Sequence, residues 1–318
     1  MVEVPLPKDK WSGKVNAVNL GAEPSTGGTR SAIVTVGGEN AMPFLGYEGL
    51  APNRVRIAGE VTDMPGEVPE QVRALFGEAT SDVAEWAKVW VENFKADLIC
   101  LRLASTNPEE SNVSPQDAAL TVLKVLKAVS VPIIVYGCGQ EEKDAKTMEA
   151  VSNAAPKERL LLGQAEEGVY KSIAAAGMAN NHAIVAFSNL DINLAKQITI
   201  LLTDFGVRKE SIVMDPLMAP LGMGLEYSYS VNERIRLAAL AGDGMLQLPM
   251  LCDCTGAWKC REATDDVADW GDRNERGKWW EATTALAAIL SGADILIMRH
   301  PGAAAEAKRA IEGLRGGA

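Results

Sequence analysis

The stretch 97-DLICLRLASTNPEESNVSPQDAALTVLKVLKAVSVPIIVYGC-138 contains two predicted strands with a predicted helix between them. The strands, 97-DLICLRL-103 and 131-VPIIVYGC-138, are short apolar runs without strict alternation, as expected of strands covered by helices on both faces. The helix, 114-SPQDAALTVLKVLKAV-129, begins with Ser114 as its N-cap and has proline at its first position. This order of strand, helix and strand is the building unit of parallel α/β folds.

The same unit recurs along the chain from residue 55 onwards. A helical pattern follows each of eight strand-like runs, which are 55-VRIAGEV-61, 97-DLICLRL-103, 131-VPIIVYGC-138, 159-RLLLGQ-164, 183-AIVAFS-188, 211-SIVMDP-216, 245-MLQLPML-251 and 294-DILIMR-299. Eight regular units favour a closed (β/α)₈ TIM barrel over an open doubly wound sheet, which is the second choice. We therefore predict an α/β fold with a TIM barrel over residues 51–318.

The first 50 residues do not follow this pattern. Two strand-like runs, 14-KVNAVNLG-21 and 31-SAIVTVGG-38, flank the turn-rich segment 22-AEPSTGGT-29. Runs of this kind separated by glycine-rich turns are typical of a hairpin. We predict that residues 1–50 form an N-terminal extension whose β-hairpin packs on the barrel and closes its bottom.

Charge and composition exclude several classes of function. The chain has 318 residues and a net charge of −11, and no basic run suits a nucleic-acid backbone. The start, 1-MVEVPLPKDKW-11, lacks the apolar core of a signal peptide, and no apolar run reaches the ~18 residues of a membrane span. We expect a cytoplasmic protein with neither a nucleic-acid partner nor a membrane partner.

Polar side chains follow the predicted strands, at the end of a TIM barrel where functional residues gather. They include Glu60, Asp63, Asn107, Tyr136, Gln164, Asn189, Asp215 and Arg299. No strand ends in a lysine suited to a Schiff base, and the chain has only two histidines for a zinc site. The sequence therefore gives no catalytic residue.

An apolar loop follows the predicted sixth strand. The segment 214-MDPLMAPLGMGLEYSYS-230 places Met218 and Met223 among prolines and glycines, where no helix face needs them. Such a loop either folds into the barrel mouth or contacts a large apolar ligand. Asp215 at its head is either part of an Asp-Pro turn or a buried carboxylate that accepts hydrogen bonds from a ligand.

The stretch 251-LCDCTGAWKC-260 holds three of the five cysteines. Its spacing matches no common zinc or iron–sulfur pattern, so we predict free thiols and no metal. The alternative is a metal site on Cys252, Cys254 and Cys260, with Cys138 as fourth ligand. The charged insertion that follows, 261-REATDDVADWGDRNERGK-278, is either a solvated lid or a loop that docks a partner.

Long stretches of the chain resemble a known family. The Asp-Pro-Leu at Asp215, together with Asn189, is similar to pterin-binding methyltransferase barrels. The closer resemblance is to the small subunit of the corrinoid iron–sulfur protein of the anaerobic acetyl-CoA (Wood–Ljungdahl) pathway. The segments that carry it are 4-VPLPKDKWSGKVNAVNLG-21, 27-GGTRSAIVTVGGENAMPFL-45, 214-MDPLMAPLGMGLEYSYS-230 and 279-WWEATTALAAILSGADILIMRHP-301.

The resemblance implies a non-catalytic barrel subunit of a heterodimeric methyl carrier used in carbon fixation. The large subunit would hold the corrinoid at the subunit interface and a four-iron cluster, while this barrel covers the cobalt face. Its other partners would be methyltetrahydrofolate:corrinoid methyltransferase and acetyl-CoA synthase. The corrinoid contacts expected from strand-end position are Asn107, Tyr136, Gln164, Asn189, Asp215, Met218, Met223 and Arg299. The alternative function is a pterin-dependent methyltransferase that itself binds methyltetrahydrofolate through Asp215 and Asn189.

Overall fold

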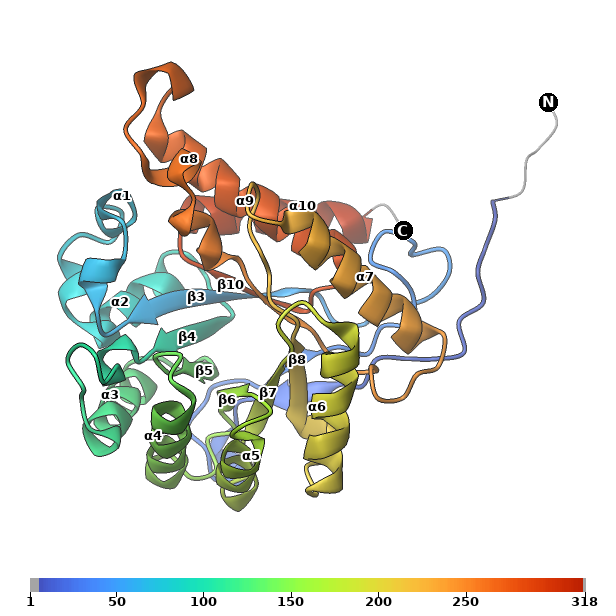
Figure 1. Ribbon diagram of the computed structural model, residues 1–318, viewed down its shortest axis with the longest axis horizontal. Helices are drawn as coiled ribbons and strands as arrows, with labels where there is room; N and C mark the ends of the chain where they lie inside the picture. Colours follow the sequence, from blue (N-terminus) through green and yellow to red (C-terminus); the bar gives the residue numbers. More distant parts are fainter. Residues whose placement is uncertain (1–5, 317–318) are drawn as a thin grey trace.

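Eight parallel strands form a barrel surrounded by helices in the computed structural model, which describes residues 6–316 (Figure 1). The strands follow one another in chain order around the barrel, and β10 pairs with β3. A bridge between Met214 and Met250 joins the two remaining edges. The TIM barrel fold is therefore confirmed. Its strands are β3 (Arg56–Thr62), β4 (Leu98–Arg102), β5 (Ile133–Tyr136), β6 (Leu161–Ala165), β7 (Ala183–Phe187), β8 (Ile212–Asp215), β9 (Leu251–Asp253) and β10 (Ile295–Met298).

The longer helices bury apolar side chains in the core that surrounds the barrel strands. Where the sequence predicts an N-cap at Ser114, its hydroxyl accepts a hydrogen bond from Asp117 N at 3.1 Å. No helix within residues 6–316 combines the length and apolarity needed to cross a membrane. The helices are α1 (Glu70–Arg73), α2 (Val83–Glu92), α3 (Pro115–Ala128), α4 (Glu141–Ala154), α5 (Tyr170–Ala179), α6 (Ile192–Asp204), α7 (Leu225–Leu240), α8 (Arg261–Thr264), α9 (Arg273–Ser291) and α10 (Pro301–Gly316).

The N-terminal extension packs its hairpin against the bottom of the barrel. Strands β1 (Val18–Leu20) and β2 (Val34–Val36) pair as an antiparallel hairpin. The side chains of Val18, Leu20, Val34 and Val36 are buried in one cluster with residues that point into the barrel, among them Leu98 and Leu161. Residues 1–5 and 317–318 lie outside the described part, and the proposed division of the chain at residue 50 stays a prediction.

A buried ion triad also fastens the extension to the barrel. Arg236 of α7 lies 2.6 Å from Glu39 of the extension and 2.8 Å from Asp294, which precedes β10. Burial raises the pKa of Glu39 to about 7, and the charge of Arg236 opposes that rise. The extension is therefore held by both apolar packing and charge.

The seventh barrel strand lies later in the chain than predicted. The sequence predicts residues 245–251, whereas β9 comprises Leu251–Asp253. Pro249 has no N–H to give to a strand ladder. The preceding residues instead serve the bottom of the barrel, where Gln247 O accepts a hydrogen bond from Asn16 N at 3.0 Å. This shift moves Cys252 from a loop into the strand and puts Asp253 at the strand's end.

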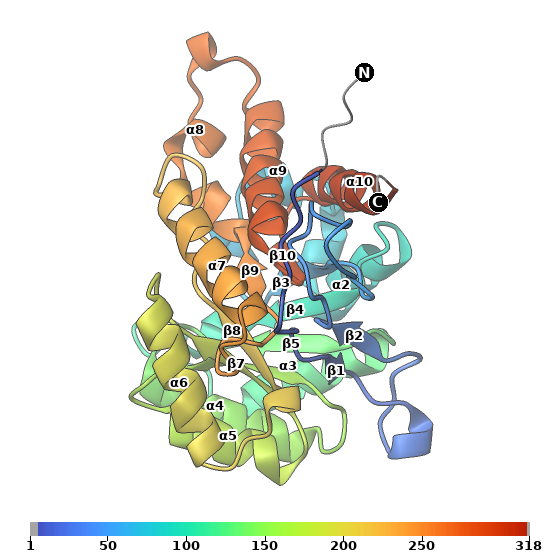
Figure 2. The same cartoon turned by 90° about the vertical axis from the view of Figure 1, so that its right-hand side faces the viewer.

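Two helices begin earlier than the helical patterns 230-SVNERIRLAALAG-242 and 279-WWEATTALAAILSG-292 predict. Helix α7 starts at Leu225, after Gly224, and Ser228 in its first turn accepts a hydrogen bond from Ala219 N at 2.7 Å. Helix α9 starts at Arg273, where Asp272 caps its first turn. As a result the charged insertion is part helix. Both views show residues 261–279 projecting beyond the barrel, around the label α8 (Figures 1 and 2).

Candidate functional site at the barrel mouth

A pocket of about 420 Å³ lies at the carboxyl ends of the barrel strands. The loops after several different strands contribute its walls, as expected of a functional site in a TIM barrel. The side chains that line it mix polar, charged and apolar groups: Glu67, Arg102, Ala104, Asn107, Tyr136, Cys138, Asp144, Gln164, Leu217, Met218, Asp253, Thr255, Trp258, Lys259 and Arg299. Such a mixture suits a ligand that is apolar in its body and polar at its edge.

Two arginines share one buried carboxylate on the floor of this pocket. Glu60 at 1% exposure lies between Arg102, whose Nε is 2.9 Å from Oε1, and Arg299, whose Nη2 is 3.0 Å from the same oxygen. Arg102 also reaches Asp253 at 2.7 Å. Burial alone would raise the pKa of Glu60, but the two guanidinium groups lower it to about 2. The floor is thus a fixed set of two positive and two negative charges.

The network leaves hydrogen-bond donors free. Within residues 6–316, the Nη1 groups of Arg102 and Arg299 have no acceptor in this chain. Their side chains remain 24% and 12% exposed, and both residues line the pocket. The guanidinium of Arg102 also lies 5.4 Å from the ring centroid of Tyr136. The floor can therefore donate hydrogen bonds to carbonyl or carboxylate oxygens of a bound molecule.

Asp215 is buried beneath the pocket and is mostly satisfied by its own chain. Its Oδ2 accepts hydrogen bonds from Tyr136 Oη at 3.0 Å and Gln164 Nε2 at 2.7 Å, and its Oδ1 accepts from Leu217 N at 3.0 Å. Burial raises its pKa to about 6, against the effect of these donors. A carboxylate offers about four acceptor positions, so about one is left for a ligand.

The structure brings most of the predicted site residues together. Five of them line the pocket: Asn107, Tyr136, Gln164, Met218 and Arg299. Asp215 lies below the pocket, hydrogen-bonded to Tyr136. Asn189 lies apart, in a neighbouring hollow with Glu166 and Phe187. Met223 is 57% exposed and does not line the pocket. That any of these residues contacts a corrinoid stays a prediction.

Two members of the floor, Arg102 and Asp253, were missed from the sequence. Arg102 is the only charged side chain inside the apolar run 98-LICLRL-103, and that isolated charge was a usable signal. Asp253 carried no such signal, because the seventh strand was expected to end at residue 251. Only the true register of β9 brings Asp253 to the mouth.

Hydrogen bonds to a buried side chain of α9 hold the backbone of Arg299 in place. Glu281 of α9 is fully buried and accepts hydrogen bonds from Arg299 N at 2.5 Å, His300 N at 2.9 Å and Trp258 Nε1 at 2.9 Å. His300 Nδ1 in turn accepts from Gly302 N at 2.9 Å, which uses one of the first free N–H groups of α10. The wall of the pocket is therefore built before any ligand arrives.

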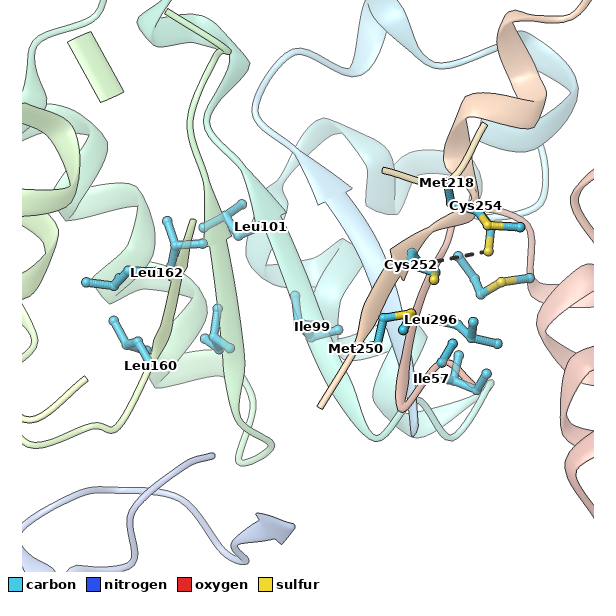
Figure 3. Packing of buried hydrophobic residues seen from close by; sticks show 14 of the residues in the cluster. Ile57, Ile99, Leu101, Leu160, Leu162, Met218, Met250, Cys252, Cys254 and Leu296 are labelled. Atoms are coloured by element: carbon cyan, nitrogen blue, oxygen red, sulfur yellow. Dashed lines mark hydrogen bonds between the residues drawn. The ribbon is translucent and has the colours of Figure 1, made fainter. Parts of the chain in front are cut away.

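Two cysteines of the stretch 251–260, Cys252 and Cys254, are core residues. Cys252 and Cys254 have no exposed surface and lie in the apolar core beside Met218 and Met250 (Figure 3). Burial raises the pKa of both thiols well above the usual value. Among residues 6–316, no three His, Cys, Asp or Glu side chains gather as a metal site. Whether Cys252, Cys254 and Cys260 bind metal with Cys138 stays untested, and free thiols remain the prediction.

The sequence matches one family model over most of its length. Residues 17–307 match the family described as CO dehydrogenase/acetyl-CoA synthase delta subunit. The acetyl-CoA decarbonylase/synthase complex subunit delta of Methanosarcina mazei is 37% identical, over 96% of this chain and 72% of the relative. The subunit delta of Archaeoglobus fulgidus is 36% identical, over 97% of this chain and 70% of the relative.

Solved structures resemble the fold with little sequence identity. Dihydropteroate synthase from Xanthomonas albilineans in complex with 7,8-dihydropteroate has a TM-score of 0.57 and 14% identity, over 86% of this chain and 98% of that one. The Yersinia pestis enzyme in a sulfonamide drug complex has a TM-score of 0.56 and 16% identity, over 85% and 97%. At this identity the likeness supports the barrel fold alone.

Proposed function

The chain belongs to the CO dehydrogenase/acetyl-CoA synthase delta subunit family, and from that premise we propose that it is the barrel subunit of a corrinoid methyl carrier. In this proposal it forms a heterodimer with a larger subunit that holds the corrinoid and a four-iron cluster. Its mouth then covers the cobalt face of the corrinoid at the interface. The assembly would receive the methyl group through methyltetrahydrofolate:corrinoid methyltransferase and deliver it to acetyl-CoA synthase.

The observation that carries this proposal is the pair of unused guanidinium donors on the pocket floor. Arg102 and Arg299 line a pocket that also contains Met218 and Trp258, and their Nη1 groups have no acceptor within residues 6–316. A corrin ring is an apolar macrocycle with amide side chains at its edge, so it needs apolar contact and donors to amide oxygens together. The residues at the mouth fit that combination.

In this proposal the chain shields the bound corrinoid and takes no chemical part in the methyl transfer. When bound, the corrinoid supplies the metal that accepts and donates the methyl group. The barrel supplies a low-dielectric wall from Leu217, Met218 and Trp258, which excludes water and oxidants from that face. The wall must separate from the partner to admit the methyl donor and acceptor. The fixed charges of Glu60 and Arg102 orient polar edges without needing a proton transfer.

The alternative of a pterin-dependent methyltransferase is not favoured. Its binding would need free acceptor atoms on Asp215 and help from Asn189. Asp215 already accepts three hydrogen bonds from its own chain, and Asn189 lines a different hollow. A pterin would therefore find only about one acceptor position on Asp215, and no Asn189 amide in the same pocket.

The test is association with the corrinoid-bearing subunit under anaerobic conditions, followed by the visible spectrum of the corrinoid. The wild-type chain should bind and change that spectrum. Arg102→Lys and Arg299→Lys keep the charge facing Glu60 but remove the guanidinium fork, so each should weaken the spectral change. Arg309→Ala on the exposed face of α10 is the control, because this side chain is 72% exposed.

Two results would contradict the proposal. One is a wild-type chain that neither binds the corrinoid-bearing subunit nor alters its spectrum. The other is tight binding of methyltetrahydrofolate by the isolated chain, lost in Asp215→Asn, which would restore the pterin alternative. Titration calorimetry with methyltetrahydrofolate measures this second case directly.

A further inference from the structure

The segment 261–279, here called the arm, rises from the barrel beside the mouth (Figure 2). We propose that the arm, with the adjoining start of α7, is a docking surface for the corrinoid-bearing subunit. The partner's facing surface would be apolar and basic. This inference rests on the proposed function, because it assumes that such a partner covers the mouth.

Several large apolar side chains are exposed together on the arm and beside it. Trp270 and Trp279 on the arm are 42% and 48% exposed, and Met223 and Tyr227 next to it are 57% and 66% exposed. By contrast, Trp258 at the base of the arm is 4% exposed. Scattered apolar residues need no explanation, but several on neighbouring elements mark a protein interaction surface. Exposed tryptophan and tyrosine are the residues that most often dominate such interfaces.

The base of the arm is locked to the pocket wall. A side chain at Gly277 would place its Cβ 2.4 Å from the ring of Trp258, so only glycine lets α9 approach this closely. Gln71 Nε2 donates to Ala263 O at 3.0 Å, and Arg276 Nη2 donates to Asp265 O at 2.9 Å. The arm is thus ordered before binding, which lowers the entropy cost of docking.

Charge indicates which kind of partner fits. The arm carries six acidic residues against four basic ones. Three of its four cations are already engaged: Arg276 lies 5.4 Å from the ring centroid of Trp270, Lys278 lies 4.9 Å from that of Trp279, and Arg261 pairs with an aspartate at 2.8 Å. The exposed Asp266 and Asp269, in contrast, form no ion pair within residues 6–316. The charge left for a partner is therefore negative.

This pattern argues against a second copy of the chain as the occupant. Two acidic arms facing each other would repel, and the whole chain carries a net charge of −11. The position of the arm favours the subunit at the mouth, because Trp258 and Lys259 both line the pocket and form the start of the arm's base. A subunit seated over the pocket would contact the arm as well.

The experiment measures the affinity of the corrinoid-bearing subunit for the full chain by biolayer interferometry under anaerobic conditions. The double variant Trp270→Ala/Trp279→Ala should bind at least ~30-fold more weakly, the size expected of an aromatic hot spot. Leu120→Ala is the matched control, since this apolar side chain is 62% exposed on α3, away from the arm. Because all three side chains are exposed, circular dichroism should show unchanged folding.

The charge variant Asp266→Lys/Asp269→Lys tests the second half of the inference. It should slow association and weaken the salt dependence of the association rate, because rim charges act mainly on encounter. If Asp266→Lys/Asp269→Lys associates as fast as wild type, the partner surface that faces the arm is not basic and this half of the inference is wrong.

The outcomes separate the two proposals. If wild type fails to bind the corrinoid-bearing subunit, the proposed function fails and the arm inference fails with it. If wild type and the double tryptophan variant bind equally, the arm inference alone is overturned. If sedimentation shows the isolated chain dimerising and the tryptophan variant monomeric, the occupant is a second copy and the inference is again overturned.

Discussion

The two ends of the same barrel are built in opposite ways. At the bottom, hairpin residues such as Val18 and Leu20 fill the barrel with apolar side chains and close it. At the mouth, the strands carry Glu60, Arg102 and Asp253; Arg102 and Asp253 line an open pocket, and the buried Glu60 pairs with Arg102. One end of the barrel thus serves stability and the other end is free for recognition, as is general in TIM barrels.

The mouth itself contains a second contrast, between two buried carboxylates. Glu60 faces two guanidinium groups, which lower its pKa to about 2 despite burial. Asp215 faces only neutral donors, so burial prevails and raises its pKa to about 6. Burial of a carboxyl group is therefore not enough to predict its charge, because the partner decides the direction.

The largest expected effect is at the bottom of the barrel. Leu20→Ala removes a side chain that is 1% exposed and leaves a cavity beneath the strands. It should lower the free energy of unfolding by about 4 kcal/mol, measured by urea denaturation, and leave affinity for the corrinoid-bearing subunit unchanged. Ile33→Ala, at a 42% exposed position of the same extension, is the control. A large loss of affinity in a folded Leu20→Ala would break the separation of the two ends.

Glu60→Gln should be the next most severe change. It removes the counter-charge of two arginines and should cost about 3 kcal/mol at pH 7. Since the pKa of Glu60 falls from 4.5 to about 2 on folding, its stabilisation exists above pH 4.5 and is lost as pH falls towards 2. The difference from wild type should therefore shrink by about 2 kcal/mol between pH 6 and pH 3. Urea denaturation at both pH values measures it.

The exposed ion pair on α10 provides the control for Glu60→Gln. Glu306→Gln removes the partner of Arg309 in an exposed pair, and it should change the free energy of unfolding very little. If Glu60→Gln were as mild as this surface variant, the ion network would not hold the floor together.

Asp215→Asn should show a pH dependence of opposite sign. The pKa of Asp215 rises from 3.8 to about 6 on folding, so its stabilisation exists below pH 3.8 and is lost as pH rises through 6. Relative to wild type, the variant should gain about 1.5 kcal/mol in free energy of unfolding between pH 5 and pH 8. A flat difference across that range would mean that the donors, and not burial, set the charge of this group.

The smallest effect concerns thiol reactivity. Burial raises the pKa of Cys138 too, but this thiol is partly exposed at the mouth, whereas Cys252 and Cys254 are fully buried and their pKa values lie well above the usual value. Iodoacetamide should therefore label Cys138 first in the folded chain, and the other two only after unfolding. Mass spectrometry of timed samples reads this out, with Cys138→Ser as the control. Early labelling of Cys252 would contradict a rigid core beneath the mouth.

Local patterns in the sequence predicted much of this molecule. The apolar runs gave seven barrel strands in nearly correct position, because strands covered on both faces must be apolar along their length. The hairpin of the extension followed from its turn residues. The prediction failed only for the seventh strand, at 245–251. Pro249 breaks the ladder there, and only contacts with the extension reveal the true start of β9.

The site followed less completely from the sequence. Strand-end position brought Tyr136, Gln164 and Asp215 to attention, and they do form one hydrogen-bonded group. It also suggested Asn189 and Met223, which lie outside the pocket. A position in the sequence places a residue at the mouth but does not say into which hollow its side chain turns.

The sequence by itself determined the barrel, because the periodicity of apolar residues is local and each strand and helix reports it independently. Only the tertiary structure decided the chemistry of the floor. Glu60 meets Arg102 across 42 positions and Arg299 across 239, and Arg102 meets Asp253 across 151. Charges so far apart in the chain form one network only after the barrel has closed and its strand register has been set.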